Sequence, residues 1–296
     1  MIGDPCCCEG NGGMRVDSGR RERLLSLSFV AVWFTVNLLF LTRFPLVHSD
    51  ESWLAGLTRN MMESRSFGVT EPFFDLKPRF PHAIKILFHL MQMPFLALIG
   101  YSAFSVRLLS LLGGAAALFL AYRCLRETAS FRTALAITVI LSLDGQFLSA
   151  AHTGRQEILL LAAMLLIMLM LIRCRGMVTP RLAIRLALVT GLTVGLHPNS
   201  FLLAMGCGLA ICLMMLSKGQ LRLKPLIAYI AVTGGIALCF VGLSLLMDRQ
   251  FPAHYLQYGE TEFELNVPAA SKFLDFFPYI GRLWRGESGT YNLPLL

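Results

Sequence analysis

Residues 24–42 read LLSLSFVAVWFTVNLLFLT and contain no charged side chain. A helix rises about 1.5 Å per residue, so this run nearly spans a hydrocarbon core of about 30 Å. It is too long for the apolar part of a signal peptide and lacks a small-residue cleavage site, which predicts a retained anchor. The whole chain is 55% hydrophobic and 15% charged, with a mean hydropathy of +0.63. Soluble domains average about 25% charged residues. The sequence therefore predicts an all-α polytopic membrane protein.

About seven transmembrane helices are predicted, at residues 24–42, 104–122, 133–149, 156–172, 182–196, 199–217 and 225–247. Four arginines precede the first span: Arg15, Arg20, Arg21 and Arg23. Because cytosolic flanks are enriched in Lys and Arg, we expect the N-terminus in the cytosol. The connections agree with this orientation, since the loops after 122, 172 and 217 are basic. The alternate connections at 150–155 and 197–198 hold only Arg155.

Three regions are expected along the chain: a cytosolic tail at 1–23, a transmembrane domain at 24–250 and an outer C-terminal tail at 251–296. A large outer loop at 43–103 carries two juxtamembrane helices. The first, at 53–65, has apolar residues roughly at helical spacing. The second lies within Pro81–Gly100, an apolar segment that contains Lys85 and Pro94. Counting this segment as a span would contradict the charge bias, so an amphipathic helix in the membrane interface is predicted.

The sequence shows no pattern typical of a cofactor site. Its eight cysteines form no C-x-x-C pair, and we read Cys6–Cys8 as part of a reduced cytosolic tail, with palmitoylation as the alternative. There is no dinucleotide-binding fingerprint after a strand, no P-loop and no nucleophile elbow. The net charge of +8 is assigned to cytosolic loops rather than to a nucleic-acid partner. We expect no cofactor, with a divalent metal as an alternative that the spacing does not indicate.

Polar side chains gather at the predicted outer ends of the spans. They come from four segments of the chain: Asp50 and Glu51; Asp75 and Lys77; His152, Arg155 and Glu157; and His197 and Asn199. Charges at such depths persist mainly where they face a cavity and pair with one another or with a substrate. A carboxylate can take a proton from an acceptor hydroxyl, and Lys or Arg can hold a phosphate. The set therefore suits transfer of a sugar or other group from a lipid-linked phosphate.

Simpler explanations exist for several of these residues. The Asp50-Glu51 pair could belong to a solvated loop, and an interfacial lysine such as Lys77 often only extends to lipid headgroups. His152 and Glu157 could merely orient Arg155.

Two further polar residues have plain structural explanations. Asn199 could be the N-cap of the span that follows it. Asp144 lies inside the apolar run 133–149, and we expect it to pair with Arg155 or to reach the outer cavity rather than to act in catalysis.

Five stretches of the chain resemble, in order, segments of one enzyme group. They are HSDESWLAGLTRNMMES at 48–64, FFDLKPRFPHAIKILFHL at 73–90, FSVRLLSLLGGAAALFLAYRCLR at 104–126, AHTGRQEILLLAAMLLIMLMLIR at 151–173 and GLTVGLHPNSFLLA at 191–204. The group is the GT-C superfamily of membrane glycosyltransferases, most similarly the dolichyl-phosphate-mannose protein mannosyltransferases and aminoarabinose transferases (glycosyltransferase family 39-like). The resemblance covers roughly residues 24–250. Members usually continue with further spans and a soluble outer domain, so the chain looks shortened at its C-terminus beside them.

The resemblance implies an inverting transfer from a polyprenyl-phosphate sugar. It implies that Asp50 is the general base, that Glu51 orients or stabilises the site, and that Lys77 and Arg155 hold the lipid phosphate. Many relatives have an acidic residue directly before the Lys-Pro motif, whereas here Leu76 is at that position and Asp75 comes one residue earlier.

The partners expected for such an enzyme are the lipid-linked sugar, a lipid, glycan or protein acceptor, and membrane lipids, with no nucleic acid. We expect an integral, multi-pass protein of a bacterial plasma (inner) membrane, with the ER membrane as the alternative. A rival function is a non-catalytic binder or flippase of lipid-linked sugars, or one subunit of a split transferase with a partner subunit. Donor binding without any product would favour this rival.

Overall fold

The computed structural model describes residues 12–71, 79–197, 199–219 and 221–255, and the described residues up to 247 form ten α-helices and no strand. The chain divides into two units, Met1–Arg249 and Gln250–Leu296, and the ten helices all belong to the first unit. The helices are α1 (Gly12–Phe40), α2 (Ser49–Ser64), α3 (Ile86–Ile99), α4 (Ala103–Arg126), α5 (Phe131–Leu143), α6 (Gly145–His152), α7 (Glu157–Arg173), α8 (Pro180–Thr193), α9 (Ser200–Ser217) and α10 (Leu223–Met247).

Four of these helices are long and apolar enough to cross a membrane: α1 over Arg20–Phe40, α4, α9 and α10. The number rises to five if the bent pair α5 and α6 is one span. Helices α7 and α8 lie where spans were predicted, but they have 17 and 14 residues and fall short of that length. The structure is thus that of a helical protein with four to five candidate membrane spans, and the count of seven stays a prediction.

Helix α4 packs against α1, α5, α6, α7 and α3, and two glycines allow this close packing. A Cβ at Gly113 would lie 2.7 Å from the Leu159 side chain of α7, and one at Gly114 would lie 2.8 Å from Ala151 of α6. A Cβ at Gly114 would therefore overlap Ala151, and at Gly113 the end of the Leu159 side chain would have to move. In the same way α8 packs on α10, where Gly191 lies against Ile236.

The predicted span 133–149 is not one continuous helix. It breaks at Asp144 into α5 and α6, which are bent by 65°. The Asp144 carboxylate caps α6 by accepting a hydrogen bond from the Phe147 amide at 2.8 Å. The indole Nε1 of Trp33 on α1 donates to the Ser142 carbonyl at 3.2 Å, which satisfies a group near the broken end of α5.

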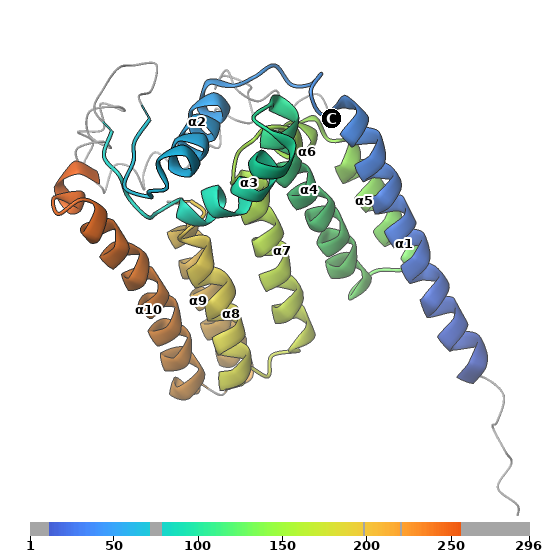
Figure 1. Ribbon diagram of the computed structural model, residues 1–296. Coiled ribbons are helices and arrows are strands. Elements are labelled where there is room, and N and C mark those ends of the chain that lie inside the picture. The colour runs from blue at the N-terminus through green and yellow to red at the C-terminus, as the bar shows by residue number, and fades with distance from the viewer. Residues whose placement is uncertain (1–11, 72–78, 198, 220, 256–296) are drawn as a thin grey trace, which may run out of the picture. The chain divides into compact units, whose positions relative to one another are not determined.

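Helices α2 and α3 lie together at one end of the first unit, which we call the α2/α3 end (Figure 1). Helix α2 starts four residues before the predicted helix 53–65 because His48 and Glu51 form a capping box. Helix α3 occupies most of the predicted segment 81–100 and contains Pro94. The segments before α7 and α9 also reach the α2/α3 end, which brings together residues far apart in the sequence.

Candidate functional site

Asp50 and Glu51 lie in the first turn of α2, directly after its cap. The Nδ1 atom of His48 accepts a hydrogen bond from the Asp50 amide at 3.2 Å, and the His48 amide donates to Glu51 Oε2 at 3.4 Å. Carboxylates in a first turn are favoured by the helix dipole. Because successive helical side chains are rotated by about 100°, the two neighbours point in different directions and meet different partners.

Glu51 points into the protein and forms a buried ion pair with Arg107 of α4. Arg107 Nε donates to Glu51 Oε1 at 2.7 Å, Nη2 donates to Oε2 at 2.9 Å, and Nη1 donates to the Leu41 carbonyl at 3.0 Å. The Gly154 amide donates to Glu51 Oε1 at 2.8 Å. The two charged side chains are 3% and 0% exposed. The Glu51–Arg107 pair therefore connects α2, α4, the residue that follows α1 and the segment that leads into α7.

The Asp50 side chain instead contacts Arg155, and both side chains are half-buried. Arg155 Nη1 lies 3.2 Å from Asp50 Oδ2, and Nη2 lies 2.5 Å from Glu157 Oε1. The side chains of Asp50, Arg155 and Glu157 are 34%, 31% and 41% exposed, so solvent reaches them. The Nε atom of Arg155 is buried and has no hydrogen-bond partner among the described residues. This arrangement leaves a carboxylate and a cation open to a ligand.

Lys85, just before α3, adds a second cation to this group. Its Nζ lies 4.9 Å from the centre of the Trp53 ring. Burial lowers the pKa of Lys85 to about 8, while the charges of Asp50 and Glu157 favour its protonated form and Arg155 opposes it. Lys85 is therefore largely protonated at pH 7. We call Asp50, Lys85, Arg155 and Glu157 the Asp50 cluster.

A buried polar network behind Lys85 holds α3 on α2. The Thr58 hydroxyl lies 2.8 Å from His89 Nδ1 and donates to Gln92 Oε1 at 2.6 Å. Gln92 Nε2 then donates to the Val106 carbonyl of α4 at 3.0 Å. Burial, with the nearby charge of Lys85, lowers the pKa of His89 to about 3, so this imidazole stays neutral. The network therefore holds α3, whose N-cap residue is Lys85, against α2 and α4.

His152 does not contact the Asp50 cluster directly in the described contacts. Its Nδ1 lies 2.9 Å from the Phe44 carbonyl, and its Nε2 lies 2.9 Å from Asn37 Oδ1 of α1. It therefore connects α6 to α1 and to the segment that leads into α2.

His197 and Asn199 lie directly before α9. His197 Nδ1 accepts a hydrogen bond from the Asn199 amide at 3.0 Å. Burial lowers the pKa of His197; the charge of Glu157 opposes this, and those of Lys85 and Arg155 add to it. His197 thus lies within electrostatic reach of the Asp50 cluster. Asn199 is the N-cap residue of α9, but its side chain makes no capping hydrogen bond.

Two predicted site residues, Asp75 and Lys77, lie outside the described residues. Asp144 is the cap of α6, and Arg155 forms its ion pairs with Asp50 and Glu157 rather than with Asp144. Within the part of the chain that the structure describes, no group of three or more His, Cys, Asp or Glu side chains could hold a metal ion.

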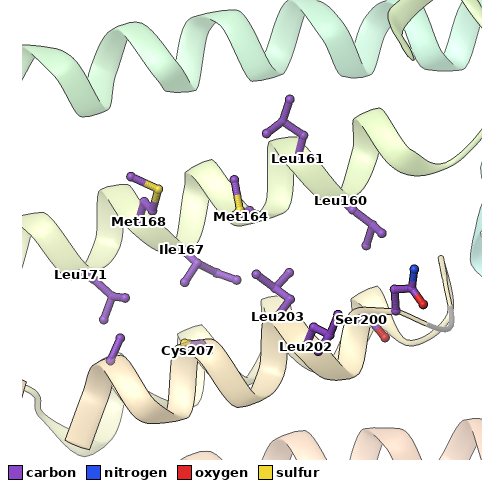
Figure 2. A pocket seen from close by; sticks show the side chains of 13 residues that line it. Leu160, Leu161, Met164, Ile167, Met168, Leu171, Ser200, Leu202, Leu203 and Cys207 are labelled. Carbon is purple, nitrogen blue, oxygen red and sulfur yellow. The ribbon is translucent and has the colours of Figure 1, made fainter. Parts of the chain in front are cut away.

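An open apolar groove of about 530 Å³ runs between α7 and α9. In Figure 2, Leu160, Ile167 and Leu171 point from α7 toward α9, and Leu203 rises from α9 to face them. Its polar lining residues are Asn199 and Ser200, both at the start of α9. Leu160 lies about one helical turn from Glu157, so the polar end of the groove lies beside the Asp50 cluster.

No protein-family model, curated protein or solved structure matches this chain. The resemblance to GT-C glycosyltransferases therefore stays a prediction from the sequence.

The sequence interpretation missed two residues of the site, Arg107 and Lys85. Both were visible as single charges inside apolar stretches, at FSVRLL and AIKILF. A charge in such a position is a functional-site hypothesis in its own right. The partner of each charge, however, is far away in the sequence: Arg107 pairs with Glu51, and Lys85 is influenced by Asp50 and Glu157.

Proposed function

We propose that this protein is a membrane glycosyltransferase that moves a sugar from a polyprenyl-phosphate donor to an acceptor hydroxyl by inversion. The observation that carries the proposal is the Asp50 cluster. An accessible carboxylate lies 3.2 Å from an arginine, beside a second cation, at one end of a set of apolar helices. A base and an anion-binding pair at such a place suit a substrate that combines a lipid, a phosphate and a sugar.

The chemistry assigns one role to each part of the cluster. The acceptor oxygen attacks the anomeric carbon from the face opposite the phosphate, and Asp50 takes the hydroxyl proton. The bond between the anomeric carbon and the phosphate oxygen breaks, and polyprenyl phosphate leaves with the electron pair. Arg155 and Lys85 stabilise the charge on that leaving phosphate, with the planar guanidinium suited to paired hydrogen bonds.

The ion pairs around Arg155 explain how the charges of the site are balanced before substrate binds. Without substrate, Arg155 is neutralised by Asp50 and Glu157. A phosphate would take over part of the guanidinium, which would release Asp50 to act as a base. Glu157 then keeps Arg155 in place, and Glu51 stays with Arg107 and fixes the turn from which Asp50 extends.

The orientation that this function needs is also a proposal. We infer that α7 and α8 cross the membrane together with the five candidate spans, so that the N-terminus is cytosolic and the Asp50 cluster faces outward. Support comes from the charges, because basic residues concentrate in the connections at the ends of the helices away from α2 and α3. The membrane would be a bacterial plasma membrane or an ER membrane. Labelling single cysteines at positions 48 and 175 with a membrane-impermeant maleimide tests this: position 48 should react from outside, and reaction at 175 instead would contradict it.

The direct test of the function is to incubate the purified protein with a mixed pool of polyprenyl-phosphate sugars and candidate acceptors, and to identify products by mass spectrometry. Transfer by the wild type that is lost in Asp50→Asn supports the proposal. Unchanged turnover in Asp50→Asn contradicts the role of Asp50. Donor binding that needs Arg155 but yields no product at any protein concentration would instead indicate a non-catalytic binder or a subunit of a split transferase.

A further inference from the structure

We propose that the groove between α7 and α9 binds the hydrocarbon chain of a single anionic lipid whose phosphate lies at the Asp50 cluster. This inference rests on the proposed function, because it places the chain of the same donor. The groove and the cluster come from different residues, so the two proposals can fail separately.

The lining of the groove matches a molecule that is apolar along its length and polar at one end. Along α7 and α9 the walls are leucine, isoleucine, methionine and small side chains, and polar groups appear only at Asn199 and Ser200. The apolar wall on α7 runs from Leu160 to Leu171, which is about 16 Å of helix. The polar end lies next to the helical turn that carries Glu157, whose carboxylate holds Arg155.

Small residues on α9 form the space. A Cβ at Gly206 would meet nothing within 4 Å, and Cys207 and Ala210 also line the groove. On the facing helix, Met164 and Met168 are 39% and 43% exposed. Methionine is flexible and polarisable, and it adapts well to an irregular hydrocarbon partner. Helix α8 packs against both α7 and α9 and so supports the two helices that form the groove.

The electrostatics favour an anionic lipid over a neutral one. Arg155 contacts Glu157, which lies one helical turn before Leu160 of the groove. Burial and the charges of Lys85 and Arg155 also lower the pKa of His197, two residues before Asn199 at the polar end of the groove, so both cations act close to that end. A neutral lipid would leave these cations without a new partner, whereas a phosphate would satisfy them. A lipid chain in the groove would also place its headgroup beside Asp50.

The first experiment is photocrosslinking of the wild-type protein with a polyprenyl phosphate that carries a diazirine part-way along its chain. We expect crosslinked peptides from α7 and α9, and we expect unlabelled polyprenyl phosphate to compete far better than polyprenol or phosphatidylcholine. Crosslinks that map elsewhere, or equal competition by phosphatidylcholine, would overturn the proposal, because bulk lipid would then explain the groove.

The second experiment fills the groove. Gly206→Leu adds a side chain at the open position, and the matched control is Gly234→Leu on α10, where a Cβ also meets nothing within 4 Å and which does not line the groove. Binding of the long-chain phosphate should fall about tenfold in Gly206→Leu, the loss expected when about two methylene groups leave an apolar site. Binding of a phosphate with a chain of two isoprene units should change little, and Gly234→Leu should behave as the wild type.

A second variant distinguishes filling of the groove from misfolding of Gly206→Leu. Ala210→Phe fills the groove at another point and should give the same chain-length dependence. Equal loss for long and short chains in both variants, or no loss for either chain, would overturn the groove assignment. If the crosslink maps to α7 and α9 while no sugar is transferred, the groove stands and the glycosyltransferase proposal fails. If sugar is transferred but no variant shows a dependence on chain length, the glycosyltransferase proposal stands and the groove assignment fails.

Discussion

Asp50 and Glu51 are neighbours in the first turn of α2, but their side chains enter two different environments. Glu51 is 3% exposed, and both of its oxygens accept hydrogen bonds, from Arg107, the Gly154 amide and the His48 amide. Asp50 is 34% exposed and shares one arginine with Glu157. A fully satisfied buried carboxylate stabilises one structure, whereas a partly satisfied accessible one can exchange partners. This difference is the basis of our proposal that Glu51 supports the site structurally and that Asp50 acts as its base.

The largest expected effect is on the buried pair. Glu51→Gln leaves the Arg107 guanidinium buried without its countercharge, and breaking such a pair typically costs about 3–5 kcal/mol of folding free energy. Thermal unfolding in detergent should show a strongly lowered midpoint. Asp50→Asn is the control, and an equal loss of stability in that variant would remove the distinction between the two carboxylates.

The next effect concerns anion binding at the open cluster. Arg155→Lys keeps a positive charge but loses the planar pair of donors, so the affinity for polyprenyl phosphate should fall about tenfold. Isothermal titration or a spin-column binding assay measures this change. The matched variant is Arg126→Lys, which alters an ion pair with Glu22 near the opposite ends of α1 and α4 and should leave binding unchanged. An unchanged affinity in Arg155→Lys would exclude Arg155 from the phosphate site.

The pH dependence provides a third test. The pKa of Lys85 is lowered from 10.5 to about 8, so this cation is present below pH 8 and is lost as the pH rises through that value. Affinity for polyprenyl phosphate should therefore decrease between pH 7 and pH 9, and Lys85→Met should abolish this step. In the folded protein without ligand, the same group should make the free energy of unfolding rise between pH 8 and pH 10.5, because the unfolded chain binds the proton more tightly there. A flat binding profile in the wild type would contradict the role of Lys85.

The helix positions could be predicted from the sequence because uninterrupted apolar runs mark them directly. Helices α4, α9 and α10 lie close to 104–122, 199–217 and 225–247. The break at Asp144 was not predicted, since the surrounding run is apolar and the Trp33 indole that compensates for the break comes from α1. Hydropathy reflects the free energy of transferring side chains into the membrane, and it contains no information on a hydrogen bond between distant residues such as Trp33 and Ser142.

The candidate site shows the same division. The sequence singled out Asp50, Arg155 and Glu157 by their charges next to apolar runs, and the structure brings these three together. It could not show that Glu51 turns inward to Arg107, because two adjacent carboxylates look equivalent until the helix and its neighbours are known. The sequence also could not show that Lys85, which lies in an apolar segment, is the second cation of the Asp50 cluster.

The smallest expected effect comes from the cap of α6. Asp144→Ala removes the acceptor for the Phe147 amide, and loss of an N-cap costs about 1 kcal/mol. The thermal midpoint should fall slightly while affinity for polyprenyl phosphate is retained, because Asp144 makes no ion pair with Arg155 among the described contacts. A marked loss of binding in Asp144→Ala would show that Asp144 belongs to the site.

The most direct test of the division between the two carboxylates is to measure stability and sugar transfer together in Asp50→Asn. We predict a thermal midpoint close to that of the wild type, retained binding of the polyprenyl-phosphate sugar, and turnover lowered by about 10²–10⁴, the usual contribution of a general base. An Asp50→Asn variant that transfers sugar at the wild-type rate, or one that loses its fold as Glu51→Gln is expected to do, would contradict it.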